Sequence, residues 1–359
     1  MPPVTIPRRQ PDEEEGYREM LARQSSDAPS KVHDLTLEPA PPPDQMRRYA
    51  DEHGILVLAH SYQEGEIQDA AHFVGDSLEL ARKAHEMKPD DICFCGVHFM
   101  AETAKILNPD STVFMPDLEA GCSLAEGCDA GDLARYQQLL KRKIGRDDLV
   151  TVCYINCTAA VKALSDVVCT SGNSLEVIDS IPADNAILFV PDVHLGGWVK
   201  EQRPEREIYL WNATCMVHEL FSIDRLVELR KQHPEAIVLA HPECPKNIRD
   251  EADHVNGTSG MLRIVKQRRG ATFIVATEGN MIYRFKQEAP ENTYIPAPGP
   301  SCACNLCPHM QRNTPEKLWC SLRHKEPEVV VPEPVASQAR IALERMLALK
   351  VGSTIRQQR

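Results

Sequence analysis

The feature that most constrains the fold of this 359-residue chain is a threefold repetition of short apolar runs separated by helical patterns. Runs of this length between amphipathic stretches are typical of buried parallel strands in βαβ units. The last run of each repeat is followed by a loop that holds a cysteine, and the separations of these cysteines are 93 and 92 residues. This period predicts three similar α/β units. The runs lie at 55–60, 92–97, 112–116, 150–156, 186–191, 207–211, 236–241, 272–277 and 292–296.

Polar residues recur at similar places in the three units. One strand of each unit ends in a polar side chain, namely His60, Asn156 or His241. Some 15 to 17 residues later, a turn with a hydroxyl group leads into a helical pattern. Parallel sheets form binding sites at the carboxyl ends of their strands, so each unit should turn this edge toward a ligand. If the units surround a common axis, the three loop cysteines converge: Cys122, Cys215 and Cys307.

Composition narrows the class of protein. The chain has 52 acidic and 40 basic residues, and its net charge of −12 argues against nucleic acid or an anionic membrane as a partner. It has no apolar run long enough to span a membrane and no apolar signal-peptide core near its start. We therefore expect a cytoplasmic protein whose 13 cysteines do not form structural disulfides. Residues 1–43 are rich in proline and charge, which predicts a mobile N-terminal extension.

The cysteines suggest a metal centre whose kind the residues alone leave open. Three thiolates suit a cubane iron–sulfur cluster with one open iron. The C-x-C-x-x-C segment at 302–307 equally suits a zinc site completed by His309 or Cys320, and a redox pair is a third reading. Other cysteines lie in apolar strand patterns and are expected to be buried structural thiols: Cys93, Cys95, Cys153 and Cys169.

Candidate proton-transfer residues follow two equivalent strands. His60 and Tyr62 follow a strand of the first unit, and His241 and Glu243 follow one of the third. Imidazole, phenol and carboxylate groups in such loops can move protons, although a single histidine at a strand end is more often structural.

The hydroxyl-bearing turns offer a second kind of candidate. Hydroxyl and N–H groups at helix starts can bind phosphate or carboxylate, and they can also simply cap the helix. The residues concerned are Ser77, Ser171 and Thr258. His218 would lie one helical turn from Cys215.

Several long segments together resemble the quinolinate synthase family. The similarity covers nearly all of residues 45–350, and the segments follow one another in the order typical of the family. They include LAHSYQEGEIQDAAHFVGDSLELARKA, GVHFMAETAKILNP, PDLEAGCSLAE, NCTAAVKALSDVVCTSGN, PDVHLGGWV, WNATCMVHELF, AHPECP, NGTSGM and CNLCPHM.

The resemblance implies a fold and a reaction. The fold is three αβα sandwich domains with parallel sheets around a pseudo-threefold axis, at 44–127, 128–217 and 218–309, with C-terminal helices at 310–350 joining the first. The implied reaction condenses iminoaspartate with dihydroxyacetone phosphate to quinolinate, phosphate and water in de novo NAD biosynthesis, using a [4Fe–4S] cluster. A functional link to an L-aspartate oxidase or dehydrogenase follows from it. A zinc-dependent hydrolase or lyase and a non-catalytic iron–sulfur sensor are the alternatives.

Residue by residue, the resemblance places the cluster ligands at Cys122, Cys215 and Cys307. It places acid–base residues at His60, Tyr62, His241 and Glu243, and substrate-binding residues at Ser77, Tyr154, Asn156, Ser171, His218 and Thr258. The chain departs from the family pattern at Ser61 and Cys157, in the spacing of its last cysteines, and at Asn256–Gly257, where Gly–Ser is more usual.

Overall fold

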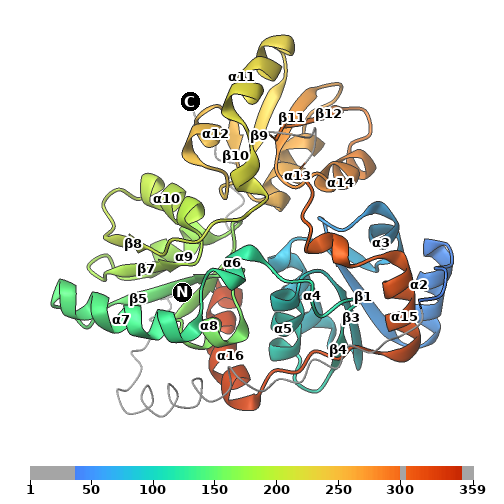
Figure 1. The fold of residues 1–359 in the computed structure, drawn as a ribbon, viewed down its shortest axis with the longest axis horizontal. Coiled ribbons are helices and arrows are strands. Elements are labelled where there is room, and N and C mark those ends of the chain that lie inside the picture. Colours follow the sequence, from blue (N-terminus) through green and yellow to red (C-terminus); the bar gives the residue numbers. More distant parts are fainter. Residues whose placement is uncertain (1–36, 300–304, 350–359) are drawn as a thin grey trace.

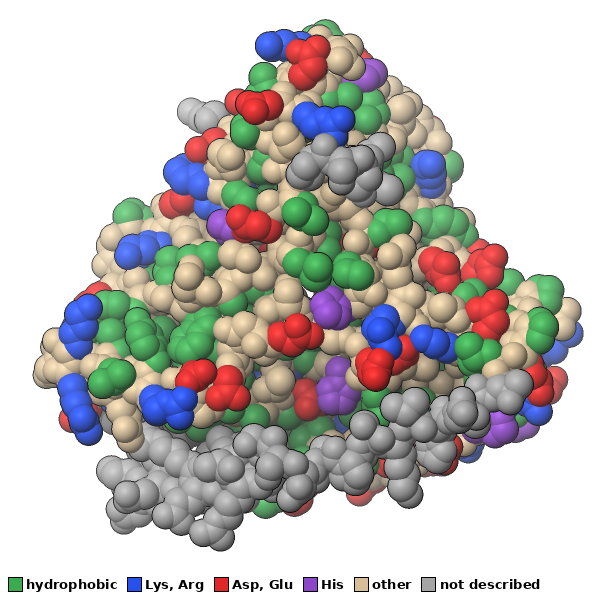
Figure 2. Space-filling view, in the orientation of Figure 1, with side chains coloured by type: hydrophobic (Ala, Val, Ile, Leu, Met, Phe, Trp, Pro, Cys, Tyr) green, Lys and Arg blue, Asp and Glu red, His purple; other side chains and the backbone are tan. Residues whose placement is uncertain are grey.

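The computed structural model describes residues 37–299 and 305–349. Its strands form three separate parallel sheets, as the repetition predicted, and each sheet has four strands where the apolar runs indicated three. Every sheet has the same strand order, with the second strand at one edge and the first beside it: β2-β1-β3-β4, β6-β5-β7-β8 and β10-β9-β11-β12. The three sheets and their helices form three lobes around a common centre (Figure 1). The outline of the molecule is roughly triangular (Figure 2).

The strands are short and mostly buried, as sheets covered by helices on both faces require. The first sheet contains β1 (Ile55–His60), β2 (Phe73–Gly75), β3 (Asp91–Cys95) and β4 (Thr112–Phe114). The second contains β5 (Val150–Tyr154), β6 (Val167–Cys169), β7 (Ile187–Val190) and β8 (Ile208–Leu210). The third contains β9 (Ile237–Ala240), β10 (His254–Val255), β11 (Thr272–Ala276) and β12 (Thr293–Pro296).

Each sheet has an equivalent set of helices, because parallel neighbours need crossover connections. One helix precedes each sheet: α2 (Pro43–Glu52), α7 (Ala130–Ile144) and α11 (Ile223–Gln232). Three helices connect its strands. They are α3 (Gly65–Ala70), α4 (Ser77–Met87) and α5 (His98–Leu107); α8 (Ala159–Ala163), α9 (Ser174–Ser180) and α10 (Val193–Gln202); and α12 (Lys246–Asp250), α13 (Thr258–Lys266) and α14 (Met281–Glu288).

The last two helices tie the units together. Helix α15 (Pro315–His324) packs on α2, α3 and β3 of the first unit. Helix α16 (Glu333–Ala348) packs on α8 and β6 of the second unit and also on α5 of the first. None of the helices among the described residues is long and apolar enough to cross a membrane. The extension predicted at 1–43 lies, up to residue 36, outside the described residues.

The strand register corrects one predicted equivalence. Ala59, Cys153 and Ala240 each pair with the last residue of a neighbouring strand, namely Cys95, Val190 and Ala276. The residues that follow them are therefore equivalent, and these are His60, Tyr154 and His241. Asn156 was expected at that place but lies two residues further on, because β5 already ends at Tyr154. It is equivalent instead to Tyr62 and Glu243.

Candidate active site at the junction of the three units

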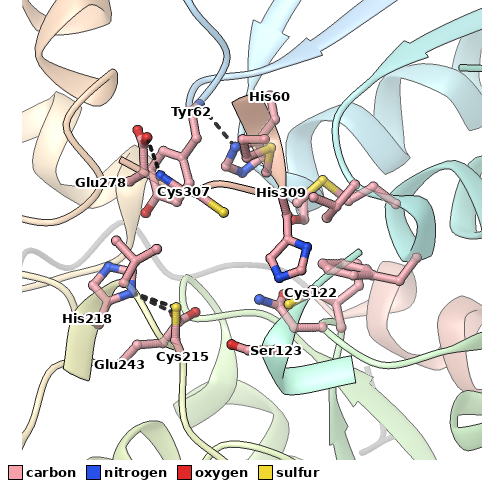
Figure 3. A pocket seen from close by; sticks show the side chains of 18 of the residues that line it. His60, Tyr62, Cys122, Ser123, Cys215, His218, Glu243, Glu278, Cys307 and His309 are labelled. Atoms are coloured by element: carbon pink, nitrogen blue, oxygen red, sulfur yellow. Dashed lines mark hydrogen bonds and ion pairs between the residues drawn. The ribbon is translucent and has the colours of Figure 1, made fainter. Parts of the chain in front are cut away.

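The residues predicted as functional lie around one central cavity of about 70 Å³. All three units contribute to its wall. The wall includes each of the 13 predicted site residues: His60, Tyr62, Ser77, Cys122, Tyr154, Asn156, Ser171, Cys215, His218, His241, Glu243, Thr258 and Cys307. The sulfur atoms of the three cysteines point into the same open space, into which the ring of His309 also projects (Figure 3).

Each of the three cysteines begins a short helical turn. Cys122 precedes α6 (Ser123–Glu126), Cys215 precedes η1 (His218–Leu220), and Cys307 precedes η2 (Met310–Arg312). Burial raises the pKa of Cys122 to about 12 and that of Cys307 to about 11, and it raises the pKa of Cys215 well above its usual value. Backbone N–H groups two or three residues further on oppose this rise. Each sulfur therefore lies where backbone N–H groups can donate hydrogen bonds to it. Because burial favours the protonated thiol, a bound cation is needed to stabilise the thiolate.

Within the described part of the chain, one group of three side chains could hold a single metal ion. Its members are Cys215, His218 and Glu243, and their donor atoms all lie within 4.8 Å of one another. The sulfurs of Cys122, Cys215 and Cys307 do not form such a group. Thiolates on one zinc ion, at about 2.3 Å from the metal, would lie closer than that. In this structure the three sulfurs are thus not close enough together to share one ion.

A chain of hydrogen bonds crosses the cavity between the units. The hydroxyl group of Tyr62 lies 2.8 Å from Oγ1 of Thr277, which lies 3.0 Å from Nε2 of His218. Nδ1 of His218 lies 2.9 Å from the Glu243 carboxylate, which also accepts a hydrogen bond from the hydroxyl group of Tyr154. The chain runs from Tyr62 in the first unit through the third unit, which contains the buried Glu243 carboxylate, to Tyr154 in the second.

Two histidines are held in the same way by the residues that follow them. The N–H of Tyr62 donates to Nδ1 of His60 over 3.1 Å, and the N–H of Glu243 donates to Nδ1 of His241 over 3.3 Å. A ring whose Nδ1 accepts carries its proton on Nε2. Burial lowers the pKa of His60 to about 4 and that of His241 to about 3. Both rings are consequently neutral near pH 7 and can donate from Nε2.

Burial also keeps Tyr62 protonated, and its partners keep Glu243 ionised. Burial and the nearby Glu243 charge raise the pKa of Tyr62 well above its usual value. Burial opposes ionisation of Glu243, but the interaction with His218 and the hydrogen bond from Tyr154 outweigh it and hold the pKa of the Glu243 carboxyl well below its usual range. The cavity therefore combines one carboxylate that can accept a proton with a phenol and two neutral imidazoles that can donate hydrogen bonds.

The three hydroxyl-bearing residues are equivalent in the strand register. On the strand that pairs with β1, β5 or β9, one residue lies opposite His60, Tyr154 or His241. The hydroxyl-bearing residue of that unit follows this opposite residue by two positions, and it is Ser77, Ser171 or Thr258. Oγ of Ser171 lies 3.2 Å from Nε2 of His241. A side chain at Gly257 would place its Cβ only 2.5 Å from that oxygen, so glycine is needed for this close approach.

Sequence reasoning missed several residues of the site. Thr277 links Tyr62 to His218, and the buried carboxylate of Glu278 accepts the N–H of Cys307 over 3.1 Å. Both follow β11, so their position at a strand end was a usable signal. His309 was considered only as a zinc ligand, with the C-x-C pair that lies outside the described residues.

Comparison with known proteins identifies close relatives. The family model described as "Quinolinate synthetase A protein" matches residues 44–348. A quinolinate synthase of Trichodesmium erythraeum is 45% identical over 312 residues, which are 86% of this chain and 94% of that protein. One of Prochlorococcus marinus (strain MIT 9303) is 48% identical over 296 residues, 82% of this chain and 87% of that protein. One of Synechococcus sp. is 45% identical over 313 residues, 87% of this chain and 96% of that protein.

Proposed function

The chain belongs to the quinolinate synthase family, and from this premise we propose that it condenses iminoaspartate with dihydroxyacetone phosphate. The products are quinolinate, phosphate and water, and the step belongs to NAD biosynthesis. The observation that carries the proposal is the cavity at the junction of the three units, where three cysteines and a network of proton-transfer groups meet. The names of the relatives supply the reaction class, and the side chains of this cavity suit it.

We propose that Cys122, Cys215 and Cys307 hold a [4Fe–4S] cluster. Three observations fit this group: the sulfurs face one space, they are more widely spaced than the ligands of one ion, and each receives backbone N–H groups. When bound, such a cluster supplies a Lewis-acidic iron that polarises a substrate oxygen. The raised thiol pKa values also fit, because a bound cation would stabilise the thiolates.

The hydroxyl and amide groups of the wall would bind the two anionic substrates. Ser77, Ser171 and Thr258 offer equivalent hydroxyl groups from the three units. The same wall also contains the phenol, amide and imidazole groups of Tyr154, Asn156 and His218, which can donate hydrogen bonds. Neutral donors suit anions that must react and leave, because each hydrogen bond contributes only about 1 kcal/mol net.

The proton transfers would use the four acid–base candidates. Glu243 is the ionised group and takes a proton, which His218 and Tyr154 can share with it through their hydrogen bonds. Tyr62 remains protonated and can donate. His60 and His241 offer Nε2–H groups to a developing negative charge on a substrate oxygen.

The proposal extends to partners and place in the cell. Iminoaspartate is unstable, so an L-aspartate oxidase or dehydrogenase must supply it close to this enzyme. We propose that the protein acts in the cytoplasm, where iron–sulfur clusters and free thiols persist.

The test is anaerobic reconstitution of the full chain, followed by analysis of iron, acid-labile sulfide and zinc. A quinolinate assay with both substrates completes it. We expect about four irons and four sulfides per chain and cluster-dependent formation of quinolinate. Zinc without sulfide would favour the single-ion group of Cys215, His218 and Glu243, and a hydrolase or lyase in place of the synthase. A loaded cluster without turnover would favour a sensor.

A further inference from the structure

A second cavity lies directly beside the catalytic cavity. It has a volume of about 320 Å³, and Asp76 and Ser171 belong to the walls of both cavities. All three units line it, through the first turns of α4 and α13 and the segment that leads into α9.

Two acidic side chains that line this cavity, Asp76 and Glu79, have partners within the protein. One carboxylate oxygen of Asp76 accepts the N–H groups of Leu78 and Glu79, at 3.0 and 2.9 Å. The other bonds the hydroxyl group of Ser259 in the third unit. The Glu79 carboxylate accepts the N–H of Asp76 over 3.0 Å. These two carboxylates cap the start of α4, and Asp76 also links the first unit to the third.

Among the described residues, the lining carboxylate of Glu176 has no hydrogen bond or ion pair, and the other lining groups that lack a partner are donors. Ser174 is 1% exposed, and its hydroxyl group has no hydrogen-bond partner among the described residues. The buried Nδ2 of Asn256 likewise has none there. The described residues also give the guanidinium of Arg263 no hydrogen bond or ion pair, although it lies near enough to Glu79 to lower the pKa of that carboxyl.

The backbone adds donors at the same wall. Helix α13 begins after Gly257, which has no side chain to cap the first N–H groups. Unpaired N–H groups at the start of a nine-residue helix favour an anion. A hydroxyl, an amide and a guanidinium beside them form a set that suits a phosphoryl group.

We propose that this second cavity binds a phosphoryl group through Ser174, Asn256 and Arg263. The inference rests on the proposed function, in which one substrate carries a phosphate and free phosphate leaves. The occupant is either phosphate on its way out or the phosphate ester of the incoming substrate.

The test measures binding without turnover. Isothermal titration calorimetry on the cluster-loaded full chain would follow inorganic phosphate in one series and dihydroxyacetone phosphate alone in another. The variants are Arg263→Gln and Asn256→Ala. Loss of a charge-assisted hydrogen bond is expected to weaken binding about tenfold for Arg263→Gln, with a smaller loss for Asn256→Ala. Arg269→Gln is the matched control, since it removes the same charge beyond the other end of α13, where the side chain is 90% exposed.

The two series separate the possible sources of the phosphoryl group. Weaker binding of inorganic phosphate in both variants assigns the cavity to the leaving group, and weaker binding of the ester assigns it to the substrate. Unchanged affinity for both ligands overturns the proposal, as does an equal loss in Arg269→Gln. If both variants bind both ligands normally while the enzyme still makes quinolinate, the cavity assignment is wrong and the proposed function stands.

Discussion

At the scale of single residues, burial decides the protonation of the groups around the catalytic cavity. It keeps two imidazoles neutral and a phenol protonated, while His218 and Tyr154 keep the Glu243 carboxylate ionised. The same burial links the stability of the fold to pH, because groups that are protonated differently in the folded and unfolded chain make the free energy of unfolding depend on pH.

His60 provides a measurable case of this linkage. The unfolded chain takes up a proton at His60 below pH 6.5, while the folded protein takes it up only near pH 4. The contribution of this neutral ring to the free energy of unfolding is thus fully present above pH 6.5. It is lost as the pH falls to 4, and the loss is on the order of 3 kcal/mol. We expect His60→Asn, whose amide oxygen can still accept the Tyr62 N–H, to lose less stability over that interval. Urea unfolding of iron-free protein at pH 7 and pH 4.5 would measure it; equal losses in both proteins would contradict the shift.

Glu243→Gln and Tyr62→Phe test the proton transfers. Both changes preserve shape, and neither residue is a proposed cluster ligand. We expect a fall in turnover of roughly 10²–10⁴-fold with the cluster absorbance retained. Near-normal rates of quinolinate formation would show that these residues are structural. Thr277→Val is a useful companion, since it breaks the link between Tyr62 and His218 while the phenol remains.

The cysteine ligands can be tested against buried cysteines of the same chain. Ser substitution at Cys122, Cys215 or Cys307 should abolish the cluster absorbance and activity. Ser substitution at buried strand positions should leave the cluster in place and cost stability only: Cys93, Cys95, Cys153 and Cys169. Full activity of a ligand variant would remove that cysteine from the set.

At the scale of helices and strands, the sequence predicted what depends on local pattern. Buried strands with helices between them are recognisable from apolar runs alone, and β1, β3 and β11 lie at or close to the predicted runs. The end of β5 was placed too late, because Ile155 continues the apolar run after the strand has ended. Thr277 gave only a weak signal, since its importance comes from two partners that lie 215 and 59 residues away.

Gly257→Ala tests how the start of α13 meets the second unit. Its φ of −66° suits alanine, so the backbone is not strained, but the new methyl group would meet the hydroxyl of Ser171. We expect Ser171 to move away from His241 and the KM for a substrate to rise about fivefold, as loss of a hydrogen bond implies. Gly197→Ala is the control, because no atom lies within 4 Å of its added Cβ. Equal effects of the two changes would contradict this role of Gly257.

At the scale of the whole molecule, the sequence could predict three units but not how they are tied together. Helix α16 contacts both the first and the second unit, whereas the 310–350 segment was assigned to the first alone. Such contacts depend on distant surfaces and leave no periodic pattern. The domain boundaries at 127/128 and 217/218 stay predictions, as does the mobility of the N-terminal extension.

Deletion of residues 1–35 tests the role of that extension. The described chain begins at Leu37, and Glu38 already forms an ion pair with Arg323 of α15, so the truncation preserves this contact. Because no proposed site residue lies in the deleted segment, we expect turnover and cluster content within about twofold of the full chain. A large loss of activity in a folded, cluster-loaded truncation would show that the extension contributes to the site.

The equivalent positions of Tyr62, Asn156 and Glu243 have a consequence for the ancestry of the fold. A ring of three identical subunits would be forced to place the same side chain at all three positions. Joining the three copies in one polypeptide removes that constraint, so each copy can mutate independently. A phenol, an amide and a carboxylate now line one cavity from positions that symmetry would have made alike. The two sides of the cavity are therefore chemically different although the three units have the same strand order.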